Sequence, residues 1–329
     1  MEKRWVIKDQ GDRELIRKLI KELNINEVLA TLLVQRGIST YAEAKAFFRP
    51  ELAGLHDPFL MKDMDKAVAR IDRAVQNGEK ILVYGDYDVD GTTAVALVYT
   101  YLNKFYDKLA FYIPDRYSEG YGVSYKGIDF AAENGFSLVI ALDCGIKAVE
   151  KVEYANQKNI DFIIGDHHRP GDSLPPAVAV LDPKRADCTY PFEELSGCGV
   201  GFKLIQAYSA HKGWAFDDLM QYLDLVVVSI AADIVAITGE NRILAYFGLK
   251  KINTQPRPGF EALLNISGVS RIPGLPDRSF NKELTISDLV FTLGPRINAA
   301  GRIESGNNSH FAYPRKSTIV GRSHQYMQY

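Results

Sequence analysis

The segment that decides the fold runs from residue 80 to residue 105 and reads KILVYGDYDVDGTTAVALVYTYLNKF. Its apolar run ILVYG is followed by three alternating aspartates, Asp86, Asp88 and Asp90, and then by the longer stretch TTAVALVYTYLNKF. A short apolar run that ends at a turn is typical of a buried strand, whereas the longer stretch is typical of a helix. The segment therefore predicts a strand, an acidic loop and a helix in succession.

The same alternation continues through the middle of the chain. Short apolar runs, LAFYI, SLVIAL and DFIIG, alternate with the helical stretches SYKGIDFAAENG and KAVEKVEYANQK. Strands that alternate with helices of this size predict an α/β fold with a mainly parallel sheet flanked by helices. We expect an N-terminal helical region over 1–75, a catalytic domain over 76–237, a helical connector over 238–305 and an atypical tail over 306–329.

Four of the predicted strands end on an acidic residue. The runs ILVYG, SLVIAL, DFIIG and VAVL are followed by Asp86, Asp143, Asp166 and Asp182. In open α/β sheets, ligands bind in the crevice beyond the carboxyl ends of the strands. The sequence therefore predicts a site rich in carboxylates at this edge of the sheet.

The composition of the 329-residue chain describes a globular protein without a strongly basic character, because the net charge is -2 and 47% of the residues are apolar. Any groove for nucleic acid must therefore be local. We see no signal peptide and no apolar run of about 18 residues, so we expect a cytoplasmic protein without a membrane partner. The spacing of the three cysteines fits neither a zinc site nor a disulfide framework.

The three aspartates of GDYDVDG indicate a metal site, because close carboxylates repel one another unless cations lie among them. A solvated acidic turn or a calcium loop of the EF-hand kind are the alternatives. An EF-hand needs a preceding helix and a Glu at the twelfth position, but here a strand precedes Asp86 and Leu97 occupies that position. The context therefore favours a divalent cation at the end of a strand.

Further candidate ligands follow along the chain. In GDHHRPG, Asp166, His167 and His168 offer an imidazole ligand together with an acid or phosphate donor. Asp143 in LVIALDCGI is either a ligand or a helix cap. Asp233 lies in the apolar segment LVVVSIAADIVAI, where an unpaired buried carboxylate costs several kcal/mol, so we expect a metal partner there. A capping role or a pair with Arg242 is the alternative.

Two segments supply positive charge. IPDRYSEGYGVS places an arginine before a loop with glycines, and LGPRINAAGRIES surrounds polar side chains with small residues. Arginine binds phosphate in a bidentate manner, and glycine lets the backbone approach a ligand. The candidate phosphate- or DNA-binding residues are Arg116, Tyr121, Gly122, Asn298 and Arg302, with Arg296 beside them. Ordinary surface arginines and turn glycines are the alternative.

Taken in order, GDYDVDG, ALDCG, GDHHRPG and AADIVA resemble the four signature motifs of the DHH phosphoesterases. IPDRYSEGYGVS, LSGCGVGFK, ENRIL and GPRINAAGRIES resemble the branch of that family that degrades single-stranded DNA from its 5′ end, and the likeness covers roughly residues 45–305. The resemblance implies a DHH-type sheet and a two-metal 5′→3′ exonuclease that uses Mn²⁺ or Mg²⁺ and releases 5′-mononucleotides in DNA repair and recombination. Single-stranded DNA, a single-strand-binding protein and a helicase are the implied partners.

The resemblance also implies roles for individual residues. The metal ligands would be Asp86, Asp88, Asp90, Asp143, His167 and Asp233, with Asp143 bridging two ions. His168 would contact the scissile phosphate, and Arg116 would help to hold the 5′-terminal phosphate. Asp166, Arg296 and Arg302 would complete the catalytic set.

The sequence departs from the family after about Glu304, where neither a DHHA1 domain nor an OB-type domain is recognisable. We therefore expect a truncated gene product, a frameshift or a fragment, in which substrate binding is weakened more than metal binding. Two other functions remain open: a DHH phosphodiesterase of short oligonucleotides or cyclic dinucleotides, and a non-catalytic Cdc45-like replication scaffold. The complete set of aspartates and histidines favours catalysis over the scaffold.

Overall fold

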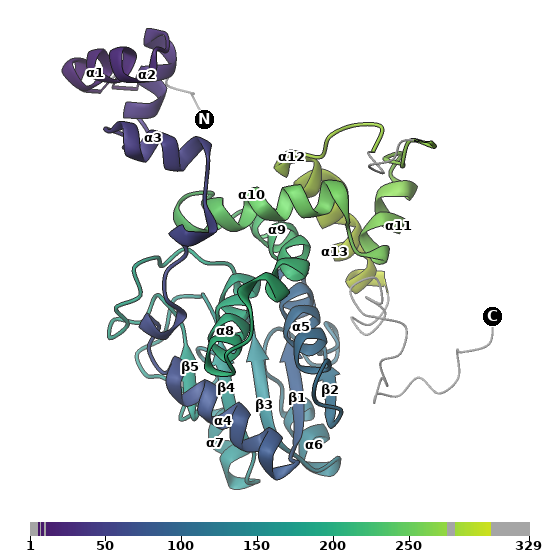
Figure 1. Ribbon diagram of the computed structural model, residues 1–329. Coiled ribbons are helices and arrows are strands. Elements are labelled where there is room, and N and C mark those ends of the chain that lie inside the picture. The colour runs from purple at the N-terminus through teal and green to yellow at the C-terminus, as the bar shows by residue number, and fades with distance from the viewer. Residues whose placement is uncertain (1–5, 7, 10, 275–279, 304–329) are drawn as a thin grey trace. The chain divides into compact units, whose positions relative to one another are not determined.

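The computed structural model describes residues 6, 8–9, 11–274 and 280–303 (Figure 1). The atypical tail expected over 306–329 lies outside these residues. Contacts divide the chain into two compact units, Met1–Leu55 and His56–Tyr329. The smaller unit contains the helices α1 (Arg13–Leu23), α2 (Glu27–Val34) and α3 (Tyr41–Phe48) and the short turn η1 (Leu52–Gly54). Its three helices enclose a small core of Ile16, Leu19, Ala30, Leu33, Ile38 and Ala44.

The larger unit is built on a five-stranded parallel sheet, as the alternating pattern predicted. Its strands are β1 (Lys80–Gly85), β2 (Leu109–Tyr112), β3 (Phe136–Leu142), β4 (Asp161–Gly165) and β5 (Ala179–Leu181). The order in the sheet is β2-β1-β3-β4-β5, so the chain moves outward in opposite directions from β1 and β3. Such a reversal opens a crevice at the carboxyl ends of the two strands, which is where ligands bind in this kind of sheet.

Helices cover both faces of the sheet (Figure 1). One face packs against α4 (Met64–Asn77), α5 (Val89–Leu102) and α8 (Gly197–His211), and the other against α6 (Tyr125–Glu133) and α7 (Val149–Gln157). We expected α4 within the N-terminal helical region over 1–75. It belongs instead to the larger unit, because it packs on β5 and α8.

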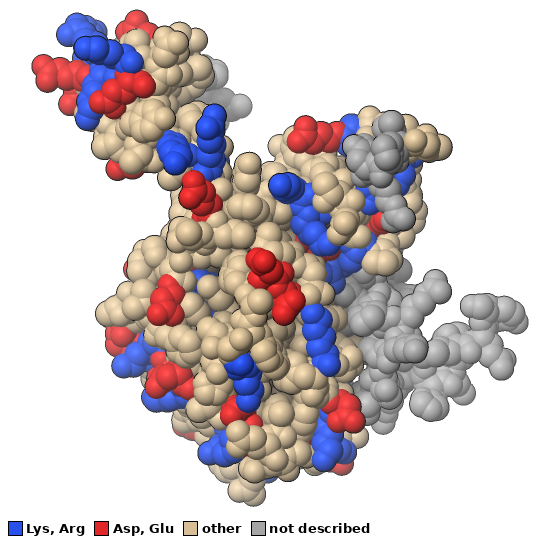
Figure 2. Space-filling model, viewed as in Figure 1, with Lys and Arg blue, Asp and Glu red and all other residues tan. Residues whose placement is uncertain are grey.

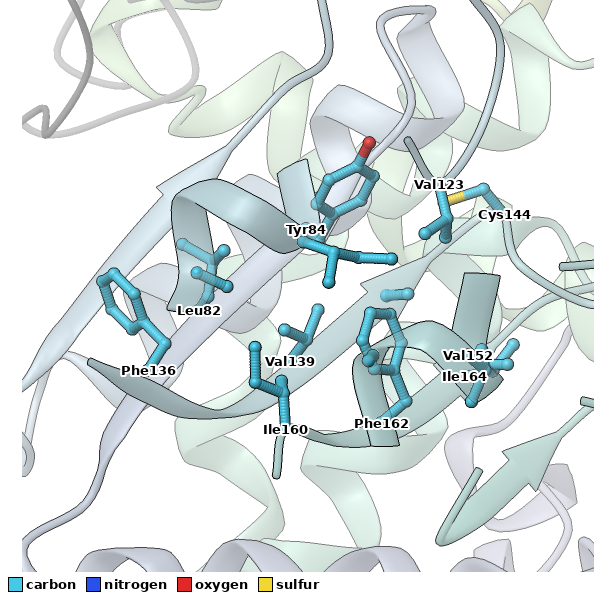
Figure 3. Packing of buried hydrophobic residues seen from close by; sticks show 14 of the residues in the cluster. Leu82, Tyr84, Val123, Phe136, Val139, Cys144, Val152, Ile160, Phe162 and Ile164 are labelled. Atoms are coloured by element: carbon cyan, nitrogen blue, oxygen red, sulfur yellow. The ribbon is translucent and has the colours of Figure 1, made fainter. Parts of the chain in front are cut away.

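The core between the sheet and α6 and α7 is formed by side chains of alternate strand residues (Figure 3). Leu82 and Tyr84 of β1, Val139 of β3, and Phe162 and Ile164 of β4 point to this face. Residues two apart on a strand lie on the same side, so each strand contributes to both cores. The sheet is therefore buried on both faces, and its carboxyl edge is held rigidly.

Helix α5 is buried along almost its whole length. Its far side is covered by α8 and by α9 (Leu223–Ala232), while its near side packs on β1 and β2. A helix that is apolar all round is typical of such a central position. Since α5 begins at Val89, directly after Asp88, its burial fixes the acidic loop that joins it to β1.

Helices continue through the segment expected as a helical connector. They are α10 (Gly239–Thr254), α11 (Pro258–Ile266), and a run formed by α12 (Ile286–Asp288), a π-helical turn (Leu289–Leu293) and α13 (Gly294–Ile303). The turns η2 (Pro58–Leu60) and η3 (Phe216–Tyr222) lie earlier in the unit. α13 packs against α5 and α9. No helix in the described part of the chain is long and apolar enough to cross a membrane.

A buried ion pair joins α8 to α10. Lys203 Nζ lies 3.0 Å from Glu240 Oε1, and both side chains are fully buried. Lys203 also donates to the carbonyl of His56 at 2.7 Å, and Tyr190 donates to Glu240 Oε2 at 2.5 Å. Each charge is therefore compensated only while the other is present.

We predict that Lys203→Met destabilises the protein by about 3–5 kcal/mol, because it leaves the Glu240 carboxylate buried without its cation. The free energy of unfolding from a urea titration measures the effect. Lys250→Met, at an exposed position of α10, is the control and should change stability by less than about 0.5 kcal/mol. Equal stabilities of the two variants would contradict the prediction.

Candidate metal centre

The acidic residues predicted at the strand ends converge at one edge of the sheet. Asp86 follows β1, Asp143 follows β3, and Asp166 and His167 follow β4 directly. Because these strands are parallel neighbours, their carboxyl ends lie side by side. Asp86 and Asp143 therefore flank the point at which the strand order reverses.

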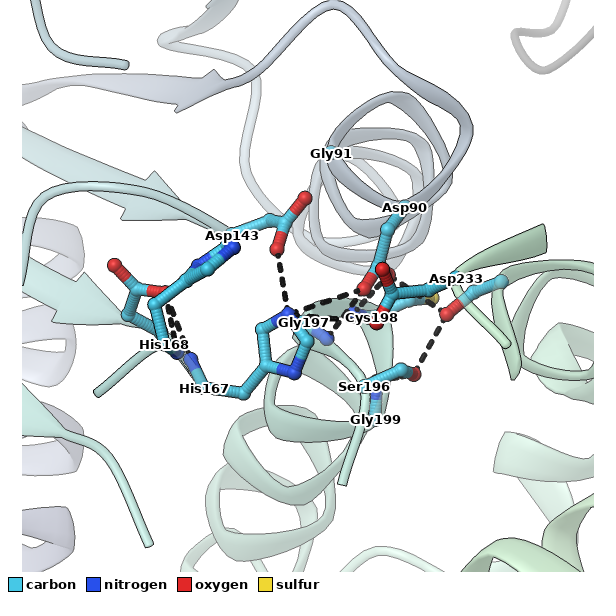
Figure 4. Close-up of polar contacts among 12 residues, drawn as sticks. Asp90, Gly91, Asp143, His167, His168, Ser196, Gly197, Cys198, Gly199 and Asp233 are labelled. Atoms are coloured by element: carbon cyan, nitrogen blue, oxygen red, sulfur yellow. Dashed lines mark hydrogen bonds and ion pairs between the residues drawn. The ribbon is translucent and has the colours of Figure 1, made fainter. Parts of the chain in front are cut away.

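His167 lies at the centre of the cluster (Figure 4). Its Nε2 is 3.2 Å from Asp143 Oδ1, 3.7 Å from Asp90 Oδ2 and 3.7 Å from Asp233 Oδ2. Ligand atoms of Asp143, His167 and His168, and those of Asp90, His167 and Asp233, lie close enough together to hold an ion. Side chains from GDYDVDG, from ALDCG and from the end of α9 thus surround the imidazole of His167, which belongs to GDHHRPG.

Several of these atoms are buried without a hydrogen-bond partner among the described residues. They are Asp86 Oδ2, Asp143 Oδ1 and both ring nitrogens of His167. Buried polar atoms in folded proteins are nearly always paired. Carboxylate oxygens and an imidazole nitrogen that face one another without a proton donor fit a divalent cation.

Asp90 is held by the start of α8 (Figure 4). Its carboxylate accepts hydrogen bonds from the backbone N–H groups of Gly197 and Cys198 at 2.7 Å and from Ser229 Oγ at 2.7 Å. Backbone N–H groups and the helix dipole both stabilise a negative charge at a helix N-terminus. The sequence analysis did not foresee these partners, although a Ser-Gly pair at the start of a helix is the signal for them.

Two glycines allow the aspartates to approach closely. A Cβ on Gly197 would lie 2.5 Å from Asp143 Oδ1, and one on Gly91 would lie 2.6 Å from the carbonyl oxygen of Asp86. Asp143 itself has a positive φ of 58°, a conformation that Asp tolerates better than most residues. Strained backbone of this kind is found where a site imposes the geometry.

His168 is oriented by Asp166. Asp166 Oδ1 lies 2.8 Å from His168 Nδ1, and Asp166 Oδ2 accepts from the N–H of Ile146 at 2.9 Å. On the other side of the ring, Tyr121 Oη lies 3.3 Å from His168 Nε2.

The hydrogen bond to Asp166 raises the pKa of His168. Burial opposes ionisation of Asp166, but the hydrogen bond and charge of His168 lower its pKa. Together these shifts favour a protonated His168 beside an ionised Asp166.

Burial has the opposite effect on the carboxylates of the metal cluster. Desolvation, with the charge of Asp90 added, raises the pKa of Asp143 well above its usual value. Desolvation and the charge of Asp88 raise the pKa of Asp86 to about 7. Desolvation and the charges of Asp90 and Asp88 raise the pKa of Asp233 to about 7 as well. Without a cation, the cluster therefore holds protons near neutral pH.

The environment of Asp233 differs from the one that the sequence predicted. We expected it to be buried in an apolar segment, but it is the C-cap of α9 and its side chain is 31% exposed. The apolar helix ends at Ala232, so the carboxylate lies at the mouth of the site, where water reaches it. It still faces the cluster, because it lines a pocket together with Asp88, Asp90 and Asn298.

The contacts of Arg116 and Arg296 in the structure are with residues outside the cluster. Arg116 is exposed, and its guanidinium lies 4.9 Å from the centre of the Tyr87 ring. Arg296 is also exposed and donates to the carbonyl of Thr292 within its own helical run, at 2.8 Å. Arg302 lies in α13, but its side chain is outside the described part of the structure. Among the described side chains of the GPRINAAGR segment, Asn298 lines the pocket beside Asp88 and Asp90.

Comparison with known proteins shows a family with the same domain. Residues 80–230 match the description "DHH family, N-terminal domain". The chain carries a DHH-family domain. It is similar to the single-stranded-DNA-specific exonuclease RecJ of Bacillus subtilis, with 40% identity over 92% of this chain and 36% of the relative. RecJ of Escherichia coli is 34% identical over 84% of this chain and 48% of the relative.

Solved structures agree with the fold of the DHH domain. A crystal structure of exonuclease RecJ bound to manganese is 29% identical, covers 79% of this chain and 61% of that chain, and has a TM-score of 0.66. RecJ from Thermus thermophilus in complex with Mn²⁺ has a TM-score of 0.74 at 24% identity and covers 93% of this chain and 42% of that chain. The chain thus spans about a third to a half of the length of the curated RecJ relatives named above.

The raised carboxylate pKa values predict an unusual pH dependence for the metal-free DHH domain. The pKa of Asp86 and Asp233 is about 7, against an ordinary value of 3.8, so the folded protein binds more protons than the unfolded chain between about pH 4 and pH 7. Its free energy of unfolding should therefore fall as the pH rises through this window, lowering the melting temperature by at least roughly 2–4 °C, and level off above it.

Thermal melts in EDTA between pH 5 and pH 8 measure this slope. Mn²⁺ should stabilise the protein more at pH 8 than at pH 5, because the cation competes with protons for the same oxygens. The double variant Asp86→Asn/Asp233→Asn is the control and should show a flatter pH profile. A wild-type melting temperature that rises steadily from pH 5 to pH 8 in EDTA would contradict the assignment.

We also predict that Gly197→Ala weakens Mn²⁺ binding by about 10–100-fold, because the new Cβ displaces the Asp143 carboxylate. Isothermal titration calorimetry of the metal-free protein gives the affinity. Gly201→Ala on the same helix is the matched control, since its Cβ would meet its nearest neighbour, Val98, at 3.4 Å. Indistinguishable affinities of the two variants would show that Asp143 does not need this space.

Proposed function

We propose that this chain is the catalytic part of a metal-dependent exonuclease that degrades single-stranded DNA from the 5′ end and releases 5′-mononucleotides. The proposal rests on one observation: the carboxylates of Asp143, Asp90 and Asp233 surround His167 Nε2. Asp143 Oδ1 and both ring nitrogens of His167 are buried without a hydrogen-bond partner among the described residues. The names of the RecJ relatives support the substrate, and a role in DNA repair and recombination is part of the same proposal.

Two divalent cations, Mn²⁺ or Mg²⁺, would occupy the cluster. The residues that would hold them are Asp86, Asp88, Asp90, Asp143, His167 and Asp233. The family resemblance would give Asp143 the position shared by both cations, and the two close groups of ligand atoms have His167 in common. A donor set of carboxylates with one imidazole suits these hard cations better than metals that prefer thiolates. When bound, such a pair supplies a hydroxide nucleophile near neutral pH and offsets the charge of the phosphate.

The chain's own residues position the phosphodiester. Asp166 fixes the His168 ring through Nδ1, and Nε2 lies 3.3 Å from Tyr121 Oη. An oxygen of the scissile phosphate would replace Tyr121 as the partner of Nε2–H. The hydrogen bond to Asp166 raises the pKa of His168, which favours the doubly protonated ring in which Nε2 carries a proton. Tyr121 holds the other side of the ring, so the donor is oriented before the substrate arrives.

Contacts to the rest of the strand would come from the rim of the site. Arg116, with Tyr121 and Gly122, follows β2, while Asn298 reaches the pocket from α13 with Arg296 and Arg302 on the same helix. We propose that these groups bind phosphates, and that a single-strand-binding protein and a helicase supply the strand. All the aspartates and histidines proposed as metal ligands are present in the chain, which favours catalysis over a scaffold role.

We predict that Asp143→Ala lowers hydrolysis by at least about 100-fold, because it removes the carboxylate shared by both sites. The fold should persist, since the change also removes a buried carboxylate whose ionisation is unfavourable. Mn²⁺-dependent degradation of 5′-labelled and 3′-labelled single strands measures activity and polarity, and circular dichroism checks folding.

Asp172→Ala, at an exposed position after the DHH motif, is the matched control and should keep full activity. Wild-type protein should release labelled mononucleotides from the 5′ end first. Mn²⁺-dependent turnover retained in Asp143→Ala, or release that begins at the 3′ end, would count decisively against the proposal.

A further inference from the structure

Two buried serines lie beside Asp90, and neither belongs to the residues that the sequence predicted for the site. Ser229 Oγ donates to Asp90 Oδ1 at 2.7 Å and lies 2.6 Å from Ser196 Oγ. Ser196 is the N-cap of α8, and its Oγ accepts from the backbone N–H of Gly199 at 3.1 Å. These four groups form a continuous run of hydrogen bonds, which we call the hydroxyl chain.

The direction of the hydroxyl chain follows from the number of protons that each group carries. A serine hydroxyl has one proton to donate. Because Ser229 donates its proton to Asp90, Ser196 must be the donor in the contact between the two serines. The N–H of Gly199 donates to Ser196, so every proton of the chain points towards Asp90. Donors arranged in this way polarise one another and strengthen the last hydrogen bond, the one to the carboxylate.

The contact of Ser229 with Asp90 is not the usual one for a hydroxyl inside a helix. Ser and Thr within helices commonly donate to the carbonyl four residues earlier. Thr93 and Thr100 on α5 do so, at 2.7 Å and 2.5 Å. Ser229 lies within α9, but its hydroxyl reaches a residue that is 139 positions away in the sequence. The packing of α9 on α5 therefore directs this hydroxyl to a carboxylate of the metal cluster.

The donors around Asp90 are divided unequally between its two oxygens. Oδ1 accepts from Ser229 Oγ and from the N–H of Cys198, both at 2.7 Å. Oδ2 accepts from the N–H of Gly197 at 2.7 Å and lies 3.7 Å from His167 Nε2. Each carboxylate oxygen has about two lone-pair positions. Oδ1 is therefore filled by protein donors, whereas Oδ2 keeps one position for a cation on the side of His167.

Ser229 also holds a second carboxylate of the cluster. Its backbone carbonyl accepts from the N–H of Asp233 at 3.0 Å, at the end of α9. Asp90 and Asp233 line the same pocket, and each has an oxygen 3.7 Å from His167 Nε2. One residue thus connects the two carboxylates whose ligand atoms, together with that of His167, lie close enough to hold an ion.

The hydroxyl chain acts on Asp90 from inside the protein. Ser196, Ser229 and Asp90 are all buried. On the visible face of the sheet-bearing part of the molecule, Lys and Arg lie interspersed with Asp and Glu (Figure 2), so the charges of that face do not favour one sign. Buried hydrogen bonds are also less weakened by water and salt than interactions between surface charges. The hydroxyl chain and the start of α8 are therefore the groups that set the position of Asp90.

We propose that Ser229, oriented by Ser196, is a positioning residue that makes Asp90 a metal ligand through Oδ2 alone. The inference rests on the proposed function, because Asp90 is one of the ligands proposed there. The hydroxyl chain fixes the carboxylate before a cation arrives, so less freedom is lost when the cation binds. Without the hydroxyl of Ser229, the carboxylate can turn about its Cβ–Cγ bond, and the cation then loses an oxygen that was held in place.

The test measures Mn²⁺ binding by isothermal titration calorimetry of the metal-free protein, which requires no hydrolysis. Ser229→Ala should weaken Mn²⁺ binding by about 10–100-fold, because it removes a group that orients a ligand. Ser196→Gly should weaken binding by a smaller factor, since glycine is an acceptable helix cap but carries no hydroxyl. In the Ser229→Ala background, Ser196→Gly should have no further effect, because Ser196 acts through Ser229.

Ser209→Ala is the matched control. It also removes a buried hydroxyl from α8, but this hydroxyl lies about 20 Å further along the helix than Ser196 and pairs with Tyr101 Oη at 2.6 Å. The control should bind Mn²⁺ as wild type does. Electron paramagnetic resonance of the bound Mn²⁺ separates positioning from a structural role. Its spectrum should change in Ser229→Ala and stay as in wild type in Ser209→Ala.

Two results would overturn the inference. One is that the effects of Ser196→Gly and Ser229→Ala on the Mn²⁺ affinity add, since the two serines would then act independently. The other is that Ser229→Ala binds Mn²⁺ as tightly as Ser209→Ala does. Ser229→Cys keeps a weak donor at the same position and gives a second measurement. Its Mn²⁺ affinity should lie between those of wild type and Ser229→Ala.

The two proposals fail separately. If wild-type protein degrades single strands from the 5′ end but Ser229→Ala binds Mn²⁺ as wild type does, the exonuclease stands and the positioning role does not. If Ser229→Ala loses Mn²⁺ affinity as expected but wild-type protein hydrolyses no strand in Mn²⁺, the positioning role stands and the exonuclease does not. Melting temperatures of all variants in EDTA confirm that each one is folded.

Discussion

The site depends on the repulsion among carboxylates that a parallel sheet brings to one edge. Asp86 and Asp143 follow neighbouring strands, the loop after β1 adds Asp88, and the first turn of α5 adds Asp90. Burial together with neighbouring negative charges raises the pKa of Asp86 and of Asp143, so positive charge at this edge favours their ionisation. The surrounding structure holds the groups together despite this cost, through the buried helix α5 and through backbone groups that need glycine at close approach.

The N-termini of two helices, α8 and α7, lie at this edge of the sheet. The start of α8 donates N–H groups to Asp90 and keeps that carboxylate in place. The start of α7, with Lys147 and Lys151, lines a cavity of about 230 Å³ that His168 also lines. Both helix starts favour negative charge through the same dipole.

The helical segment after the sheet takes part in the site. The family match ends at residue 230, whereas Asp233 at the end of α9 and Asn298 on α13 line the pocket beside Asp88. Both reach the centre because α9 and α13 pack against α5. The segment that the sequence suggested as a connector therefore closes one side of the metal centre, and the site is not confined to the strand ends.

The sequence by itself determined the parallel sheet and the position of the acidic edge. Apolar runs of strand length followed by aspartates have this consequence in any open α/β fold, since parallel strands end together. Only the tertiary structure decided that Asp233 is exposed at a helix end and that α4 belongs to the larger unit. It also decided that Asp90 meets Gly197 and Ser229, which lie 107 and 139 residues further along the chain. No sequence period records such contacts, because they arise from the way helices pack across the sheet.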